Sequence, residues 1–391
     1  MVRFLVLAMF WSGALDAETV LVLPFFNHAK SAGLDWIGES IAETVRDSLA
    51  SEGKLVLDRE DRMEAYRRLS LRPGAELTKA SIMKIGDSLG ASQVVYGYYE
   101  LLPAEDGASQ SKGSLRVTAR LLDLKRTRQG PVFSQLGAME DLATLEVRLG
   151  WQVLDQIDPK AAPSEQEFLK ARPPVRLDAV ERYVRGLLAA SPEQRHRFFT
   201  QAARLDEHYS QPCFQLGKTY WEKKDYKVAA GWLERVARSD PHYLEAQFFL
   251  ALCWFNSSDF SGAERALTAV AAAVPLNEVY NNLGTAQARL NNSAGAIANF
   301  RKALEGDSAD PDYHFNLGYT LWRAGQYEAA VESLRAVVAR NPNDAEATAL
   351  LGRALKRDGP RPGDPRSDAR ERLKTTYEEA AYRQLQAELA R

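Results

Sequence analysis

The residue types that most often carry chemistry are few in this chain, and their spacing does not suit a metal site. The sequence of 391 residues contains five histidines and two cysteines. A helical zinc site such as HExxH needs two histidines four positions apart, and no histidine pair here has that spacing. His208 and His242 are 34 residues apart, which fits a structural repeat better than a pair of ligands. We therefore predict no metal site.

Catalytic patterns are equally sparse. Two carboxylate pairs, Glu39 with Glu43 and Asp58 with Glu60, could act as general acid and base. No activating partner accompanies them in the sequence, so we expect solvated helix and loop residues. No segment matches the phosphate-binding patterns GxxxxGK[ST] and GxGxxG or the nucleophile pattern GxSxG. The sequence predicts a protein that is not an enzyme and has no cofactor.

Charge argues against a nucleic-acid binder. The formal net charge is -2, whereas nucleic-acid-binding domains show a strong basic excess or a basic face. The basic run 125–128 falls at an expected turn. We interpret it as a solvated turn, with contact to an anionic lipid or polymer as the alternative.

A repeat with a period near 34 residues is the strongest internal pattern. A leucine followed by a small residue recurs at intervals of 34, 33, 34 and 34. An alanine follows each of the first four small residues by twelve positions, and a large apolar residue follows each alanine by four. The recurring pairs are Leu216-Gly217, Leu250-Ala251, Leu283-Gly284, Leu317-Gly318 and Leu351-Gly352.

This spacing has a steric explanation. Two antiparallel helices approach closely only where a small side chain on one meets a larger one on the other. Proline then ends the second helix, because it cannot donate the required hydrogen bond. One hairpin cannot bury its own apolar face, so neighbouring hairpins stack into a superhelix. Cys213 and Cys253 fall at different heights on neighbouring helices of this pattern. We expect two buried free thiols and no disulfide.

These residues resemble the tetratricopeptide repeat (TPR) family, and four units match from Ser210 to Asp344. A degenerate unit precedes them, and a fifth unit is interrupted by the sequence GPRPG after Asp358. We predict an all-α TPR solenoid over residues 177–358. Residues 359–391 would form a loop and a polar helix, from Ser367 to Ala390, that caps the exposed end.

The resemblance implies a concave groove lined by the first helix of each hairpin. Aromatic and arginine side chains are frequent anchors of interfaces, and asparagine can pair with both N–H and C=O of an extended peptide. The arginines would suit an acidic segment or a terminal carboxylate. Packing between repeats is the alternative for Phe248, Phe255 and Phe315. The predicted groove residues are Phe214, Lys218, Trp221, Phe248, Phe255, Asn281, Asn282, Arg289, Phe315, Asn316, Tyr319, Trp322, Arg323, Arg353 and Arg357.

Residues 18–158 have a different pattern of apolar and polar residues. Short apolar runs alternate with helical patterns, which predicts an α/β domain with a mixed sheet and packed helices. The order Leu23-Pro24-Phe25, Trp36-Ile37-Gly38-Glu39, Asp58-Arg59, and Val94 to Gly97 resembles the TolB-like or FlgO-like domain of bacterial envelope proteins. The resemblance implies a binding or assembly role at the envelope and no catalytic residues. A linker is predicted over residues 159–176.

The first residues have the pattern of a secretory signal peptide. Arg3 precedes the apolar run Phe4–Trp11, and small residues follow as far as Ala17. We predict a signal peptide over residues 1–17, and hence a periplasmic or secreted protein. The alternative is that Val2–Met9 forms a first buried strand.

The leading prediction is therefore an exported, non-enzymatic scaffold that binds a protein or peptide, such as another envelope protein, with peripheral membrane or cell-wall association. One alternative is a ligand sensor or enzyme-associated regulatory domain around Pro24, Phe25 and Asp58, since ligands often bind at strand ends. The other is a structural subunit of a secretion or pilus-like assembly.

Overall fold

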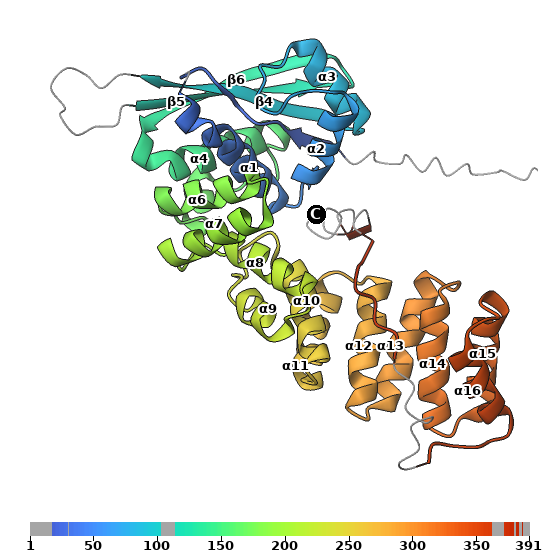
Figure 1. Cartoon of the computed structure of the whole chain (residues 1–391). Helices are drawn as coiled ribbons and strands as arrows, with labels where there is room; N and C mark the ends of the chain where they lie inside the picture. The colour runs from blue at the N-terminus through green and yellow to red at the C-terminus, as the bar shows by residue number, and fades with distance from the viewer. Residues whose placement is uncertain are drawn as a thin grey trace, which may run out of the picture.

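The protein folds into an α/β domain followed by a curved stack of helices (Figure 1). This computed structural model describes residues 18–29, 31–102, 114–361 and 371–378, with Ala381, Tyr382 and Leu385. The arrangement confirms the predicted fold class. The predicted signal peptide, residues 1–17, lies outside the described residues. None of the described helices is long and apolar enough to cross a membrane.

The sheet of the first domain is mixed. Its order is β3-β1-β4-β5-β6, and the short β2 also pairs with β4. β1 runs parallel to β3 and β4, whereas β4, β5 and β6 are antiparallel neighbours, with β6 at the edge. The strands are β1 (Thr19–Val22), β2 (Phe26–Asn27), β3 (Leu55–Val56), β4 (Gln93–Leu102), β5 (Ser114–Asp123) and β6 (Arg128–Ala138).

Both faces of the sheet are covered, because its central strands are apolar on both sides. Val20 and Val22 face the core shared with α1 and α4, while Leu21 and Leu23 face the core shared with α2 and α3. The first of these cores continues into the helical stack, which lies against α1 (Figure 1). The helices are α1 (Trp36–Ala50), α2 (Arg59–Arg68), α3 (Lys79–Ser88) and α4 (Leu142–Ile157).

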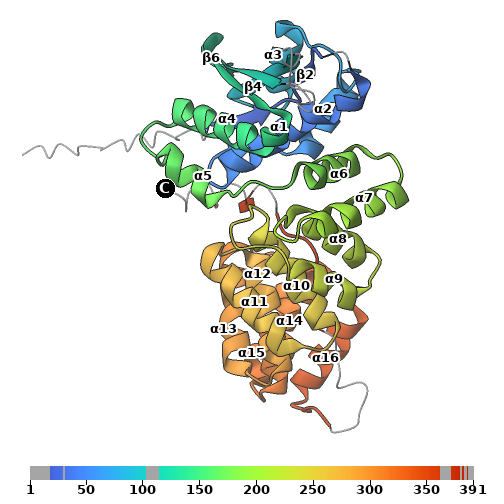
Figure 2. The same cartoon turned by 90° about the vertical axis from the view of Figure 1, so that its left-hand side faces the viewer.

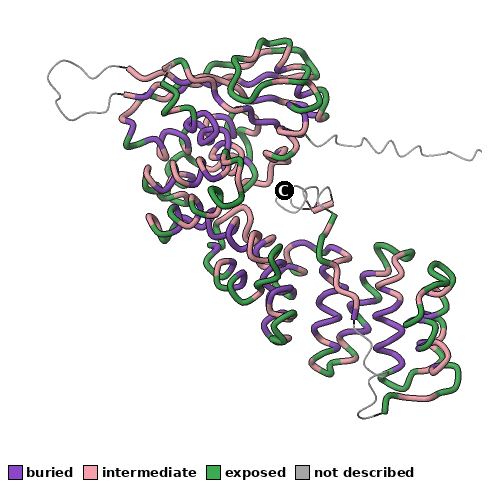
Figure 3. Tube along the Cα trace, in the orientation of Figure 1, coloured by how far each residue is buried: buried purple, intermediate pink, exposed green. Residues whose placement is uncertain are grey.

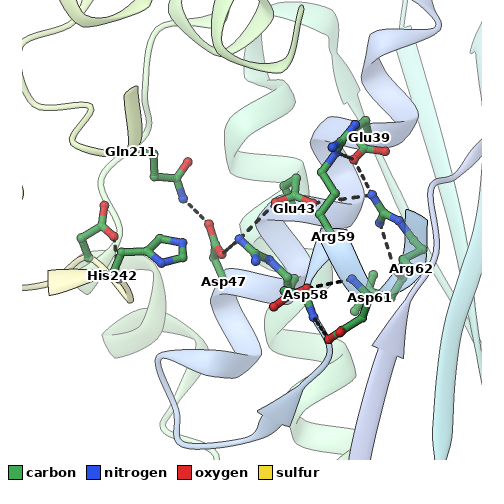
Figure 4. A network of polar contacts seen from close by, with 12 residues as sticks. Glu39, Glu43, Asp47, Asp58, Arg59, Asp61, Arg62, Gln211 and His242 are labelled. Atoms are coloured by element: carbon green, nitrogen blue, oxygen red, sulfur yellow. Dashed lines mark hydrogen bonds and ion pairs between the residues drawn. The ribbon is translucent and has the colours of Figure 1, made fainter. Parts of the chain in front are cut away.

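A buried charge cluster joins α1 to α2, and it contradicts our expectation that Glu39 and Glu43 are solvated (Figure 4). Arg62, whose side chain is 3% exposed, forms ion pairs with both carboxylates and donates to the carbonyl of Val22 at 3.1 Å. Arg59 donates to Glu39 at 2.7 Å. Burial raises the pKa of Glu39, but Arg62 and Arg59 hold it below its usual value. Arg59 and Arg62 are distant from these carboxylates in the sequence, so the spacing of residues did not predict the ion pairs.

Asp58 has a local role in the same region. It is the N-cap of α2, where its side chain accepts from the N–H of Asp61 at 3.0 Å and forms a reciprocal capping box with that residue. Figure 4 shows Asp58 and Asp61 facing one another at the start of this helix. Capping explains an aspartate at this strand end without any ligand.

Glu146 gives the packing of α1 against α4 a pH dependence. Its side chain is buried and accepts from the hydroxyl of Thr44 at 2.9 Å. Burial raises the pKa of Glu146 to about 7 from an ordinary value of 4.5. The folded state therefore holds this proton more tightly than the unfolded state. Its contribution to stability is fully present below pH ~4.5 and is lost as the pH rises through ~7.

We expect Glu146→Gln to stabilise the protein at pH 8 by up to about 3 kcal/mol, because the neutral amide removes the cost of a buried charge. The gain should shrink toward zero near pH 4.5. Urea unfolding of both proteins between pH 4.5 and 8 measures this difference. The exposed Glu140 provides the control, Glu140→Gln. An equal gain at all pH values would contradict the assignment.

The predicted linker 159–176 is not simply an irregular segment, because it contains a helix, α5 (Glu165–Ala171). Phe168 of this helix is buried in the core of the first domain. The guanidinium of Arg172 lies 3.7 Å from the centre of the Phe168 ring and pairs with Glu52 of the α/β domain at 2.5 Å. Part of the segment is therefore fixed to the α/β domain.

The helical stack consists of antiparallel hairpins (Figure 2). A Cβ at Gly217 would lie 2.5 Å from Leu233, and one at Gly284 would lie 2.8 Å from Phe300, so the small residues allow the close approach that the spacing predicted. Cys213 and Cys253 are buried free thiols, as predicted. The helices are α6 (Leu177–Leu188), α7 (Pro192–Leu205), α8 (Gln211–Glu222), α9 (Tyr226–Leu233), α10 (Tyr243–Asn256), α11 (Phe260–Ala273), α12 (Asn277–Arg289), α13 (Ser293–Gly306), α14 (Pro311–Arg323), α15 (Tyr327–Arg340) and α16 (Ala345–Leu355).

The predicted capping helix from Ser367 to Ala390 is wrong for residues 371–378, which we call the tail segment. These residues have no helical structure. They lie along the inner side of α12 and α14 instead of at the open end of the stack (Figure 1). Polar composition had suggested an exposed cap, but the tail segment makes its polar contacts inside the groove.

Candidate functional site

The tail segment crosses the first helices of successive hairpins in the reverse of chain order. Arg372 contacts α14, Lys374 contacts α12, and Tyr377 contacts Phe248 on α10. The same helices carry most of the predicted groove residues. Figure 3 shows buried positions concentrated along α12 and α14, where the tail segment passes. The concave groove therefore holds an extended segment of its own chain.

Two asparagines bind the main chain of this segment. Asn316 donates to the carbonyl of Arg372 at 2.8 Å and accepts from its N–H at 2.7 Å. Asn282 makes the equivalent pair with Lys374, at 2.7 and 2.8 Å. Asn281 connects the two asparagines, because it accepts from Asn316 and donates to Asn282 as well as to the Arg372 carbonyl. All three asparagines are fully buried. They bind any extended backbone, independently of its side chains.

Two arginines bind an acidic side chain at one end of the segment. Arg289 lies 2.8 Å from the carboxylate of Glu371, and Arg323 lies 4.0 Å from it. The Glu371 side chain is buried by these contacts. The other two arginines that we predicted in the groove, Arg353 and Arg357, pair with different residues. Arg357 pairs with Glu328, and Arg353 with Asp358, away from the tail segment.

Three aspartates of the groove bind the basic side chains of the segment, and our sequence prediction did not include them. Arg372 pairs with Asp344 at 2.8 Å, and Lys374 pairs with Asp310 at 2.8 Å and Asp312 at 2.7 Å. Asp310 belongs to the recurring Asp-x-x-Tyr pattern at the repeat junctions. In the structure Asp310 caps α14, where its side chain accepts from the N–H groups of Asp312 and Tyr313. The second role, as a carboxylate facing the groove, is visible only in three dimensions.

The predicted aromatic residues divide between groove and core. Phe315 is buried, and the guanidinium of Arg372 lies 3.6 Å from its ring centre. Phe248 is also buried and meets the Tyr377 ring edge-on at 5.2 Å. Both therefore serve repeat packing and the groove floor at once. Phe255 packs against Phe260 of α11, the second helix of the same hairpin, so this ring contact lies within one repeat.

Two further predicted residues lie at the far end of the groove. The Trp322 indole is fully buried and donates to the carbonyl of Asp358 at 2.8 Å. Tyr319 is buried and stacks between Phe315 and Trp322. Their contacts pack α14 against the end of the helical stack, so these two residues stabilise the helix that carries Phe315 and Asn316.

Comparison with known proteins agrees with the helical pattern. Two family models described as tetratricopeptide repeat match the chain, one over residues 288–354 and the other over residues 214–278 and 255–314. The helical half of this protein is built of tetratricopeptide repeats. These repeats are a scaffold for protein interaction.

A curated relative matches only part of the repeats. The anaphase-promoting complex subunit CDC16 of Saccharomyces cerevisiae is 35% identical over 75 residues, which are 19% of this chain and 9% of that protein. The chain thus spans less than a tenth of the length of this curated relative.

Solved structures of other proteins are similar to part of this chain. MamA 41-end from Desulfovibrio magneticus RS-1 is 25% identical, and the match covers 41% of this chain and 92% of that chain with a TM-score of 0.37. YrrB, described as a TPR protein with an unusual peptide-binding site, is 18% identical over 41% of this chain and 84% of that chain, with a TM-score of 0.36.

The first tetratricopeptide repeats face the α/β domain, and the predicted residues Phe214, Lys218 and Trp221 lie there. His242 stacks on Phe214 with ring centres 4.6 Å apart. Lys218 pairs with Glu245 at 3.1 Å. Burial raises the pKa of Glu245, but its partners His242 and Lys218 lower it to about 2. Phe214 and Lys218 line a cavity that Tyr377 of the tail segment also lines, whereas the Trp221 ring packs against Tyr226 and Phe249.

A cavity of about 290 Å³ lies between the first repeats and the helices α1 and α2, and residues of both parts line it. Its polar lining includes charges that pair with one another: Arg46 with Asp47 at 2.7 Å and with Glu43 at 3.0 Å, and Lys218 with Glu245 at 3.1 Å. Figure 4 shows Asp47 facing Gln211 of the first full repeat, to which it is hydrogen-bonded. Within the described residues, no cluster of His, Cys, Asp and Glu could hold a metal ion.

Proposed function

We propose that this protein is an exported scaffold of the cell envelope that binds an extended segment of a partner protein in its concave groove. The observation that carries the proposal is the two-way hydrogen bonding of Asn282 and Asn316 to the main chain of an extended segment. Such pairs supply affinity for backbone, and flanking charges supply specificity. The partner is a protein or peptide and not a nucleic acid.

Export and an envelope location rest on sequence patterns. The basic and apolar run of residues 1–17 has the form of a signal peptide. The TolB-like or FlgO-like pattern of the α/β half supports an assembly role at the envelope, including peripheral association with the membrane or cell wall.

A ligand sensor in the α/β half is the weaker proposal. Its best location is the cavity between α1 and the first repeats. The charges there are engaged with one another, whereas the groove already holds a segment by directional bonds to its main chain. This contrast favours peptide binding over ligand sensing.

A displayed peptide library tests the proposed function. The full chain and the full-length variant Arg372→Pro/Lys374→Pro serve as baits, because proline lacks the N–H that Asn316 and Asn282 accept. We expect bound peptides whose affinity falls at least about tenfold when Asn282→Ala/Asn316→Ala is added, since each asparagine makes two main-chain hydrogen bonds. Asn299→Ala, at a nearly buried asparagine outside the groove, is the matched control. Peptide binding in the groove would be refuted if neither bait selected a peptide whose affinity falls when Asn282→Ala/Asn316→Ala is added.

A further inference from the structure

We propose that the tail segment is an internal ligand that closes the groove, and that the partner displaces it with a segment of the same charge order. That order is an acidic residue, basic residues one and three positions later, and an aromatic residue six positions later. In this chain the four positions are Glu371, Arg372, Lys374 and Tyr377. The inference rests on the proposed function and specifies its ligand.

The groove is electrostatically polar along its length. Arg289 and Arg323 form a basic end that holds Glu371. Asp310, Asp312 and Asp344 form an acidic side that holds the two bases of the tail segment. A segment bound in the opposite direction would place like charges against one another. The arrangement therefore fixes both the charge order and the direction of an extended ligand.

The contacts that hold the tail segment are suited to exchange. Five of its hydrogen bonds go to main-chain atoms of Arg372 and Lys374, which any extended segment presents. The Arg372 and Lys374 side chains are each 22% exposed, so solvent reaches their ion pairs and weakens them relative to fully buried pairs. Thr375 and Thr376 are exposed. A partner competes mainly with the high local concentration of a tethered segment, on the order of mM.

The tail segment also links the groove to the cavity beside the α/β domain. Tyr377 packs against Phe248 of the groove and against Tyr382, with ring centres 5.2 and 5.1 Å apart. Tyr377 and Tyr382 both line the cavity. Displacement of the tail segment would thus remove the Tyr377 side chain from the cavity wall and from its contact with Tyr382.

Fluorescence anisotropy with a labelled peptide of the sequence of residues 371–378 tests the proposal. We expect weak binding to the full chain and binding at least about tenfold tighter to Arg372→Pro/Lys374→Pro, in which the tethered competitor is weakened. Thr375→Ala/Thr376→Ala, at exposed tail positions, should behave like the unaltered chain. A peptide with alanine at its first, second and fourth positions should bind at least tenfold more weakly.

The possible results separate the two proposals. Equal affinity of the peptide for the full chain and for the proline variant would overturn the internal-ligand inference, although library peptides could still support groove binding. A proline variant that binds library peptides in the groove but not the tail peptide would overturn the charge order. Concentration-dependent dimers of the full chain, lost in the proline variant, would show that the tail binds a second copy and would also overturn closure within one chain.

Discussion

Replacing Arg62 with alanine is expected to destabilise the protein by about 3–5 kcal/mol, because the change removes the main counter-charge of buried Glu39 and leaves buried Glu43 with Arg46 alone. The Glu39 and Glu43 side chains are each 7% exposed, and Arg62 pairs with both. Arg62 also satisfies the carbonyl of Val22 at the end of a central strand. Urea unfolding at pH 7, followed by circular dichroism, measures the loss.

An exposed pair on the same helix provides the control. Arg67 pairs with Glu64 at 2.7 Å, but its side chain is 73% exposed. Arg67→Ala should change the free energy of unfolding by less than about 1 kcal/mol, as expected for solvent-screened pairs. Equal effects of the two substitutions would mean that burial does not distinguish the pairs, and would refute a structural role for Arg62.

Asn316→Ala should release the middle of the tail segment. The substitution removes both hydrogen bonds to the main chain of Arg372 and the bond to Asn281. Groups left unpaired in a buried site cost about 1–3 kcal/mol each. Hydrogen–deuterium exchange of residues 371–378 should therefore accelerate by about 10- to 100-fold.

The matched control for this exchange experiment is Asn299→Ala. Asn299 donates to Gln287 and to the carbonyl of Gly295, and none of these contacts involves the tail segment. It should leave exchange in residues 371–378 unchanged. Similar protection of the tail segment in the unaltered chain and in Asn316→Ala would show that Asn316 does not hold it.

Local patterns carried much of the fold. The apolar periodicity and the recurring Leu-Gly pairs determine the hairpins, because a Cβ at Gly217 or Gly284 would collide with the facing helix. The last Leu-Gly pair does not have the same steric role, because none of the described helices packs against its glycine. A Cβ at Gly352 would meet nothing within 4 Å, and α16 is the last helix of the stack in the described part of the chain. Repeat phase also brought Asn282, Asn316, Arg289 and Arg323 to one surface.

Long-range burial and pairing were decided only by the tertiary structure. Glu39 and Glu43 look like surface carboxylates in the sequence, and their buried state depends on Arg62, which lies on another helix. The tail segment looks like the start of a helix, but the paired hydrogen bonds of Asn282 and Asn316 hold it extended.

The sequence by itself therefore determined the repeats, the α/β domain and the helix faces that form the groove, since these follow from short-range periodicity and steric fit. Only the tertiary structure decided which carboxylates are buried, that Asp310, Asp312 and Asp344 face the groove, and that the chain's own tail lies within it. These features depend on contacts between residues that are distant in sequence, and no local pattern specifies such contacts.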